Sequence, residues 1–193
     1  MTDRGDAGGN AGVQSGRGGV TVREASPNEH AEAGRVTAEA YRQFARDGDT
    51  DWLDYLELIA DVAARADRTT IFVALDGDRV VGSATLELHD RVDTDDDEPL
   101  QPGESHIRML GVEPAARGRG AARALVHACI DRARARGKTF MTLHTTERMR
   151  DAQRMYEAMG FARLEDRVLD DGFVLMTYWR SIAGPAEPAP SAD

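Results

Sequence analysis

The chain has 193 residues, with 24 lysines and arginines against 34 aspartates and glutamates, so its net charge is −10 and its sequence pI is about 5.0. A chain this acidic is a poor ligand for nucleic acid, because proteins that bind a phosphate backbone usually present a basic face. No run approaches the ~18 apolar residues that a membrane span needs, and the single cysteine, Cys129, excludes an internal disulfide and a cysteine metal cluster. The classes of protein that remain are an α/β or all-α enzyme and a small-molecule binder. No metal, nucleic acid or membrane is expected among the partners of the protein.

The two ends of the chain differ in composition from the middle. Residues 1–19 are rich in glycine with almost nothing apolar, and residues 183–193 are rich in proline and alanine. Such segments cannot offset the entropy that ordering costs, so both are predicted to be disordered tails. The first also lacks the apolar stretch of a secretory signal, which predicts a cytoplasmic protein. Residues 20–182 are predicted to form one domain.

Apolar residues alternate between helix and strand spacing along this domain. Ser26, with Glu29 three residues later, has the pattern of a capping box and predicts a helix start. Asp76-Gly77-Asp78 and Asp170-Asp171-Gly172 lie between β-rich runs and predict hairpins. In chain order the sequence predicts a strand over 20–24, helices from 26 and from 51, strands over 69–75, 79–88 and 104–112, a helix over 118–136, a strand over 138–144, a helix over 149–159, and strands over 161–169 and 173–179. Hairpins mixed with β-α-β crossovers imply an α/β (α+β) fold, a mixed sheet of about six to seven strands with helices on both faces.

The turn between the strand over 104–112 and the next helix is rich in glycine and arginine. A helix N-terminus leaves its first N–H groups unpaired and carries a partial positive charge. Gly118 and Gly120 let the backbone approach an anion closely, and Arg117 and Arg119 add formal positive charge. This is the composition of a phosphate cradle; a tight turn with solvated arginines has the same composition.

The same turn, Arg117–Ala122, resembles the (Gln/Arg)-x-x-Gly-x-(Gly/Ala) signature of the GNAT family of N-acetyltransferases, which move acetyl groups from acetyl-CoA to amines. Ile107–Pro114 resembles the fourth strand of that family, and Ala152–Phe161 resembles its fourth helix with a Tyr-x-x-x-Gly-Phe ending. The predicted elements also follow the order of the family. The resemblance therefore covers nearly all of residues 20–180 and implies the GNAT fold.

The resemblance implies a site for acetyl-CoA. The pyrophosphate would be bound, largely through backbone N–H groups, by Arg117, Gly118, Arg119, Gly120, Ala121 and Ala122. The strand segment Leu110, Gly111 and Val112 would bind the pantetheine arm through its main chain, as an added strand does. The family usually has a β-bulge near Leu110, whose N–H would polarise the thioester carbonyl, and its fourth and fifth strands splay there. Met149 stands where many relatives carry an asparagine that contacts pantetheine, so this contact is expected to be absent.

The resemblance places Tyr156 where relatives often protonate the departing thiolate; the alternative is a core aromatic. A general base is also needed, because an alkylammonium with a pKa near ~10.4 is mostly protonated at neutral pH. His106 falls where the histone-acetylating relatives place a catalytic glutamate, and Glu104 shares its strand parity. Glu87 and His144 are the further candidates, and the choice among these residues stays open.

The sequence therefore predicts an acetyl-CoA-dependent N-acetyltransferase that acts on a primary amine, of a small molecule, peptide or protein, by direct attack in a ternary complex. No covalent enzyme intermediate is expected, because Cys129 lies on the inner face of a helix. The alternatives are an acyl-CoA-binding regulatory module with little catalysis and a transferase that uses a longer acyl-CoA. A homodimer through the strand over 173–179 is a further hypothesis. The acidic block Asp93–Glu98 is predicted to be a solvated loop that draws a cationic substrate toward the cleft, and the identity of the amine stays open.

Overall fold

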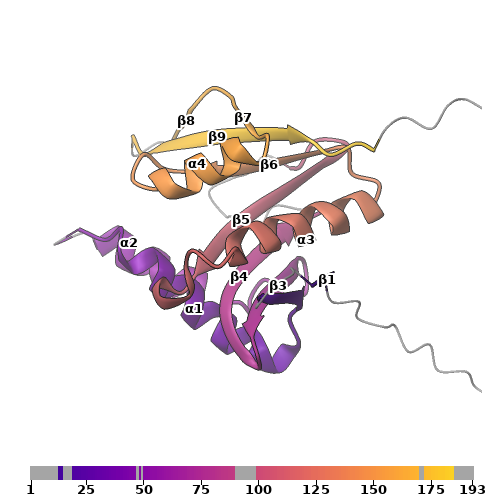
Figure 1. Ribbon diagram of the computed structural model, residues 1–193. Coiled ribbons are helices and arrows are strands. Elements are labelled where there is room, and N and C mark those ends of the chain that lie inside the picture. The colour runs from indigo at the N-terminus through magenta and orange to yellow at the C-terminus, as the bar shows by residue number, and fades with distance from the viewer. Residues whose placement is uncertain are drawn as a thin grey trace, which may run out of the picture.

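A mixed sheet runs through the molecule, and helices pack against both of its faces (Figure 1). The computed structural model describes residues 13–14, 19–46, 48, 50–89, 99–169 and 172–184. The strands are β1 (Val13–Gln14), β2 (Thr21–Glu24), β3 (Thr70–Asp76), β4 (Arg79–Glu87), β5 (Glu104–Val112), β6 (Phe140–Thr145), β7 (Ala162–Arg163), β8 (Arg167–Val168) and β9 (Val174–Ser181). The helices are α1 (His30–Arg42), α2 (Thr50–Ala60), α3 (Ala121–Ala135) and α4 (Arg150–Ala158), with short 3-10 turns at η1 (Pro27–Glu29) and η2 (Pro114–Ala116).

The strand order is β1-β2-β3-β4-β5-β6-β9-β7, and β8 pairs with β9. Neighbouring strands are antiparallel except β5 and β6, which are parallel and joined through α3. This arrangement confirms the predicted fold class. Strand β1 falls within the stretch predicted to be a disordered tail and pairs with β2. The acidic block 93–98 lies outside the described residues, and none of the helices inside them has the length and apolarity to cross a bilayer.

The two faces of the sheet carry separate cores, and β3 contributes to both. Ile71 and Val73 pack with Val36 of α1, whereas Phe72 and Ala74 belong to the larger cluster around α3. Successive side chains of a strand point to opposite faces, so the continuous apolar run of β3 serves a sheet that is covered on both sides.

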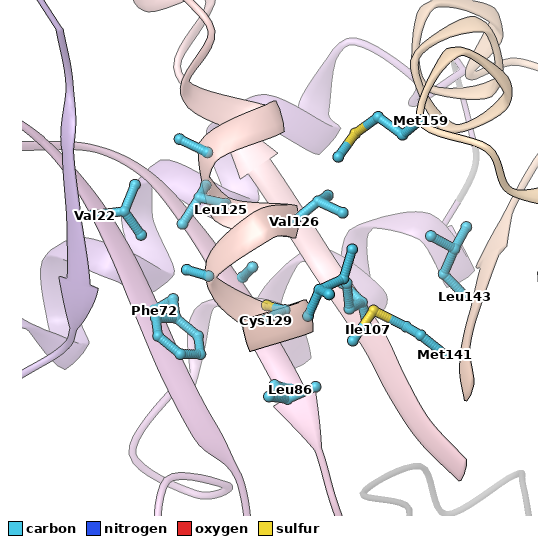
Figure 2. Packing of buried hydrophobic residues seen from close by; sticks show 14 of the residues in the cluster. Val22, Phe72, Leu86, Ile107, Leu125, Val126, Cys129, Met141, Leu143 and Met159 are labelled. Atoms are coloured by element: carbon cyan, nitrogen blue, oxygen red, sulfur yellow. The ribbon is translucent and has the colours of Figure 1, made fainter. Parts of the chain in front are cut away.

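Helix α3 supplies the centre of the larger core (Figure 2). Leu125, Val126 and Cys129 are fully buried there, near the strands that carry Leu86 and Ile107. Burial raises the pKa of the Cys129 thiol well above its usual range, so the thiol stays protonated. The structure confirms the prediction that Cys129 is a core residue.

One predicted strand is divided in two. The sequence predicted a single strand over 161–169, but the structure has the two-residue strands β7 and β8, both paired with β9. Between them, both carboxylate oxygens of Asp166 accept hydrogen bonds from Arg163 at 2.8 Å, and Leu164 is exposed. This local ion pair joins residues three positions apart, which fits a turn between the two short strands better than one extended strand.

The predicted capping box is present at the start of η1. The carboxylate of Glu29 accepts hydrogen bonds from the backbone N–H of Ser26 at 2.8 Å and from its hydroxyl at 2.7 Å. Arg23 of β2 donates two further hydrogen bonds to this carboxylate, both at 2.7 Å. These contacts, led by the bonds from Arg23, lower the pKa of Glu29 from 4.5 to about 2. The helix start is thereby tied to the sheet.

The substitution Glu29→Gln is expected to lower the free energy of unfolding by about 1–2 kcal/mol at pH 7, because it weakens the cap and removes the ion pair. Since the folded-state pKa is depressed, this stabilisation is present above pH 4.5 and is lost as the pH falls toward 2. The difference between the wild type and the variant should therefore shrink over this range in denaturant titrations. Glu32→Gln, which breaks an exposed pair with Arg35, is the control and should change stability by less than ~0.5 kcal/mol. A pH-independent difference for Glu29→Gln would contradict the ion pair.

Candidate active site

Strands β5 and β6 begin side by side and then separate. Their paired residues run from Glu104 with Phe140 to Ile107 with Leu143, whereas β5 continues to Val112 and β6 to Thr145. A cavity of about 720 Å³ opens at this separation, lined by residues of α1, the second half of β5, the turn before α3, the first residues of α3, the end of β6 and α4. The splayed strands implied by the resemblance are thus present.

A β-bulge lies in β5 at the same point. Ser83 pairs with Gly111 and Thr85 pairs with Arg108, so the two residues Met109 and Leu110 stand opposite one residue of β4. Met109 has a φ of 52°, in the left-handed region that costs a non-glycine residue roughly 1–2 kcal/mol. The bulge that the resemblance implied near Leu110 is therefore present, and Leu110 lines the cavity.

The turn before α3 presents backbone to the cavity. Gly118 and Gly120 have φ values of 76° and 85°, and an added Cβ on either would meet nothing within 4 Å. The first N–H of α3 with a described backbone acceptor is that of Ala124, which donates to Gly120 O at 3.0 Å. The N–H groups of Ala121 and Ala122 precede it, and both residues line the cavity. This end of the cavity has the geometry of an anion site.

The two arginines of the predicted cradle make different contacts. Arg117 donates to Gln43 Oε1 at 2.9 Å and to Val112 O at 3.3 Å, so it ties the turn to α1 and β5. Arg119 forms an exposed ion pair with Asp76 of the β3–β4 hairpin, at 2.5 and 3.0 Å, and is not among the cavity-lining residues. The structure therefore assigns both guanidinium groups contacts that hold the turn in place.

Besides Arg117, the cavity is lined by two exposed arginines, Arg123 and Arg150, and by the half-buried Arg148. Arg123 is the third residue of α3, and Arg150 is the first residue of α4. Sequence reasoning missed both, although their positions in the first turns of two helices were a usable signal. They supply the positive charge that Arg119 does not bring to the cavity.

Tyr156, the predicted proton donor, lines the cavity from α4 and is 5% exposed. Its ring packs against Phe161 and Tyr178, with centroid distances of 5.9 and 6.0 Å. Burial raises the pKa of the Tyr156 hydroxyl, so the phenol holds its proton at neutral pH. Tyr156 therefore has the contacts of a core aromatic and the position of a cavity residue.

The structure brings the base candidates His106, Glu104 and His144 together. The rings of His106 and His144 are 4.9 Å apart between centroids, and Thr142 is hydrogen-bonded to both His106 and Glu104. Glu104 and His106 are each 3% exposed and are not among the cavity-lining residues, whereas His144 is half-buried and lines the cavity. A group in the cavity therefore meets His144 first.

The fourth base candidate, Glu87, lies elsewhere in the core. It is fully buried, and its carboxylate is 3.6 Å from the guanidinium of Arg108. Beside them Arg65 donates to Ile59 O at 3.0 Å and to Thr85 Oγ1 at 3.1 Å, which ties the end of α2 to β4. Burial, followed by repulsion from Arg108, lowers the pKa of Arg65 to about 10. Arg65 thus holds the end of α2 against β4, and none of these three ions is among the cavity-lining residues.

Aromatic side chains of α1 and α2 gather beside the cavity. Tyr41 stacks on Trp52 at a centroid distance of 6.5 Å and packs against Tyr55 and Phe44. Tyr41 and Phe44 line the cavity, and burial raises the pKa of Tyr41. Arg148, after β6, donates to Phe44 O at 2.7 Å and lies over the ring of Trp52. The sequence analysis did not find this wall, because its members come from separate elements.

The described residues fit acetyl-CoA. The helix N-terminus and its glycines suit a pyrophosphate, and the separated edge of β5 suits an amide-bearing arm that pairs as a strand does. The hydroxyl of Thr145 is buried at the cavity wall and has no hydrogen-bond partner among the described residues. A polar ligand in the cavity would satisfy it.

Comparison with known proteins supports this fit. Residues 34–161 match the acetyltransferase (GNAT) family. The chain belongs to the GNAT acetyltransferase family. Members of this family bind acetyl-CoA and an acceptor, and the resemblance found in the sequence is confirmed.

Two curated relatives of this GNAT protein are mycothiol acetyltransferases. The protein of Thermomonospora curvata is 29% identical over 151 residues, which are 75% of this chain and 45% of that protein. The protein of Geodermatophilus obscurus is 34% identical over 97 residues, which are 50% of this chain and 30% of that protein. The chain thus spans less than half the length of these relatives.

Solved structures share its fold. An acetyltransferase from Salmonella typhimurium, solved with its cofactor acetyl-CoA, gives a TM-score of 0.62 at 21% identity and covers 89% of this chain and 98% of that chain. The ribosomal-protein-S18-alanine N-acetyltransferase from Escherichia coli gives a TM-score of 0.63 at 17% identity, over 87% and 97% of the two chains. The predicted GNAT fold is confirmed.

Proposed function

We propose that this GNAT protein is an acetyl-CoA-dependent N-acetyltransferase that moves an acetyl group to a primary amine by direct attack in a ternary complex. One observation carries the proposal. A single cavity joins the N-terminus of α3 to the separation of β5 and β6, and its wall holds the imidazole of His144 and the phenol of Tyr156. Burial of the Cys129 thiol supports direct attack over a covalent enzyme intermediate.

The residues proposed to bind acetyl-CoA are those that the sequence implies, together with two arginines that line the cavity. The amides from Gly118 to Ala122 would bind the pyrophosphate, and Arg123 and Arg150 would supply the positive charge. The main chain of Leu110–Val112 would hold the pantetheine arm. When bound, acetyl-CoA supplies an activated thioester carbonyl.

Each remaining step belongs to a side chain or amide of this protein. The N–H of Leu110 would donate to the carbonyl oxygen as it becomes negative. His144 would accept the proton that the attacking nitrogen loses. The ring of His144 is in contact with the ring of His106. Tyr156 would donate its proton to the departing thiolate and recover one from water. Protons balance, because the amine loses one and the thiolate gains one.

The test is thiol release from acetyl-CoA across a panel of amino sugars, polyamines, amino acids, short peptides and the acceptor of the mycothiol acetyltransferases. Amine-dependent release, with the acetyl group found on nitrogen by mass spectrometry, is the expected result. Saturable CoA binding without release across the panel would favour the regulatory module instead. Faster release from longer acyl-CoA donors would favour the longer-chain transferase.

For the acetyl transfer so measured, Tyr156→Phe is expected to lower kcat about 10- to 100-fold while leaving the dissociation constant of acetyl-CoA nearly unchanged, because the ring packing is kept and only the acidic proton is lost. Tyr178→Phe is the matched control, since its ring packs on Tyr156 but it is not among the cavity-lining residues. Steady-state kinetics and calorimetry measure the two quantities. Full activity of Tyr156→Phe would make Tyr156 a core residue only.

A further inference from the structure

A chain of hydrogen bonds joins side chains of β5 and β6, and one of its members, His106, packs against the ring of His144. The Oγ1 atom of Thr142 is 2.7 Å from His106 Nδ1 and 2.6 Å from Glu104 Oε1. These three residues are 8%, 3% and 3% exposed, in the order Thr142, His106 and Glu104. The parallel register places Thr142 directly opposite His106. The three side chains therefore form one buried polar unit.

The direction of each proton in this unit follows from the number of donors. A threonine hydroxyl has a single proton, and an ionised carboxylate only accepts. Glu104 Oε2 accepts the backbone N–H of Gln101 at 2.9 Å, and Oε1 accepts the hydroxyl of Thr142. The hydroxyl proton of Thr142 is thereby used, so at 2.7 Å its oxygen accepts from His106 Nδ1–H. The neutral ring of His106 then carries its basic lone pair on Nε2.

We infer that Thr142 is a positioning residue, which fixes His106 as the Nδ1–H tautomer and couples it to the carboxylate of Glu104. The inference rests on the proposed function, because the proton that it serves is the one lost by the acceptor nitrogen. That proton passes from His144 to Nε2 of His106. In this step an N–H bond of His144 breaks and an N–H bond at Nε2 of His106 forms. The resulting imidazolium is stabilised by the negative charge of Glu104 through the Thr142 hydroxyl, as a carboxylate stabilises and orients an imidazole in other relays.

The first arm of the test needs no activity. The protein labelled with ¹⁵N-histidine is compared by NMR as wild type, Thr142→Ser and Thr142→Val, and His106→Gln identifies the His106 signals among the five histidines. The wild type and Thr142→Ser are expected to show Nδ1–H at His106, and Thr142→Val is expected to lose this preference. An Nε2–H tautomer in the wild type would overturn the inference.

The second arm is kinetic. Thr142→Val is expected to lower kcat about tenfold or more with the KM for acetyl-CoA unchanged, and Thr142→Ser is expected to restore kcat to within about threefold of the wild type. A wild-type kcat in Thr142→Val, or a loss that Thr142→Ser does not restore, would overturn the positioning role. If Thr142→Val does not fold, Thr142→Ala takes its place in both arms, because it removes the same hydroxyl and adds no bulk.

The two arms separate the failure of this inference from the failure of the proposed function. If the wild type shows no transfer on any amine, the proposed function fails while the NMR arm still decides the tautomer. If transfer is present and the tautomer of His106 does not depend on the Thr142 hydroxyl, only the inference fails.

Discussion

Gly34→Ala is expected to lower the free energy of unfolding by about 2 kcal/mol or more, although alanine is the better helix former by ~1 kcal/mol. Gly34 lies inside α1, where an added Cβ would come within 1.8 Å of the carbonyl oxygen of Ala60 at the end of α2. That atom belongs to backbone, so it cannot rotate away as a side chain does. The two helices must separate, and the packing between them is lost. Urea unfolding measures the change.

Gly184→Ala is the control for this experiment, because an added Cβ there meets nothing within 4 Å. It should leave the free energy of unfolding within ~0.5 kcal/mol of the wild type. If Gly34→Ala instead stabilised the protein, as helix propensity alone predicts, α1 and α2 would not approach each other as closely as the structure has them.

Gly120→Ala is expected to raise the dissociation constant of acetyl-CoA more than tenfold, which is about 1.4 kcal/mol. Gly120 has a φ of 85° at the N-terminus of α3 and lines the cavity, so the substitution strains the turn and places a methyl group where the backbone would meet the pyrophosphate. Isothermal titration calorimetry with acetyl-CoA measures the affinity.

Gly77→Ala is the matched control. Gly77 also has a positive φ, 62°, and open space around an added Cβ, but it lies in the β3–β4 hairpin and is not among the residues that line the cavity. Both variants should lose a similar ~1–2 kcal/mol of stability through backbone strain, whereas only Gly120→Ala should lose affinity. If the two variants bound acetyl-CoA with equal affinity, the start of α3 would not be the site that binds the pyrophosphate.

The family and the local turns were open to prediction because their signals are short. The capping box of Ser26 and Glu29, the Asp76-Gly77 hairpin and the positive φ of Gly118 each depend on residues a few positions apart. The GNAT signature from Arg117 to Ala122 is equally local, and the match over residues 34–161 confirmed the family that it indicates.

The catalytic candidates could be predicted only in part. Strand parity predicts that Glu104 and His106 point to one side, and they share Thr142 as a hydrogen-bond partner. Thr142 is 36 residues from His106 in the sequence, and its position opposite His106 depends on the register between β5 and β6. No pattern within either strand contains that register, so the sequence analysis did not consider Thr142.

The sequence by itself determined the order of the elements, the covered sheet and the glycine-rich turn that opens α3. Only the tertiary structure decided which side chains meet. In the tertiary structure, Arg119 pairs with Asp76 and Arg117 donates a hydrogen bond to Gln43, whereas Arg123 and Arg150 are exposed at the cavity. The physical reason is range: helix caps, turns and apolar periodicity act over a few residues, whereas register, strand separation and helix contacts join segments far apart in the chain and settle which polar groups are buried and which line the cavity.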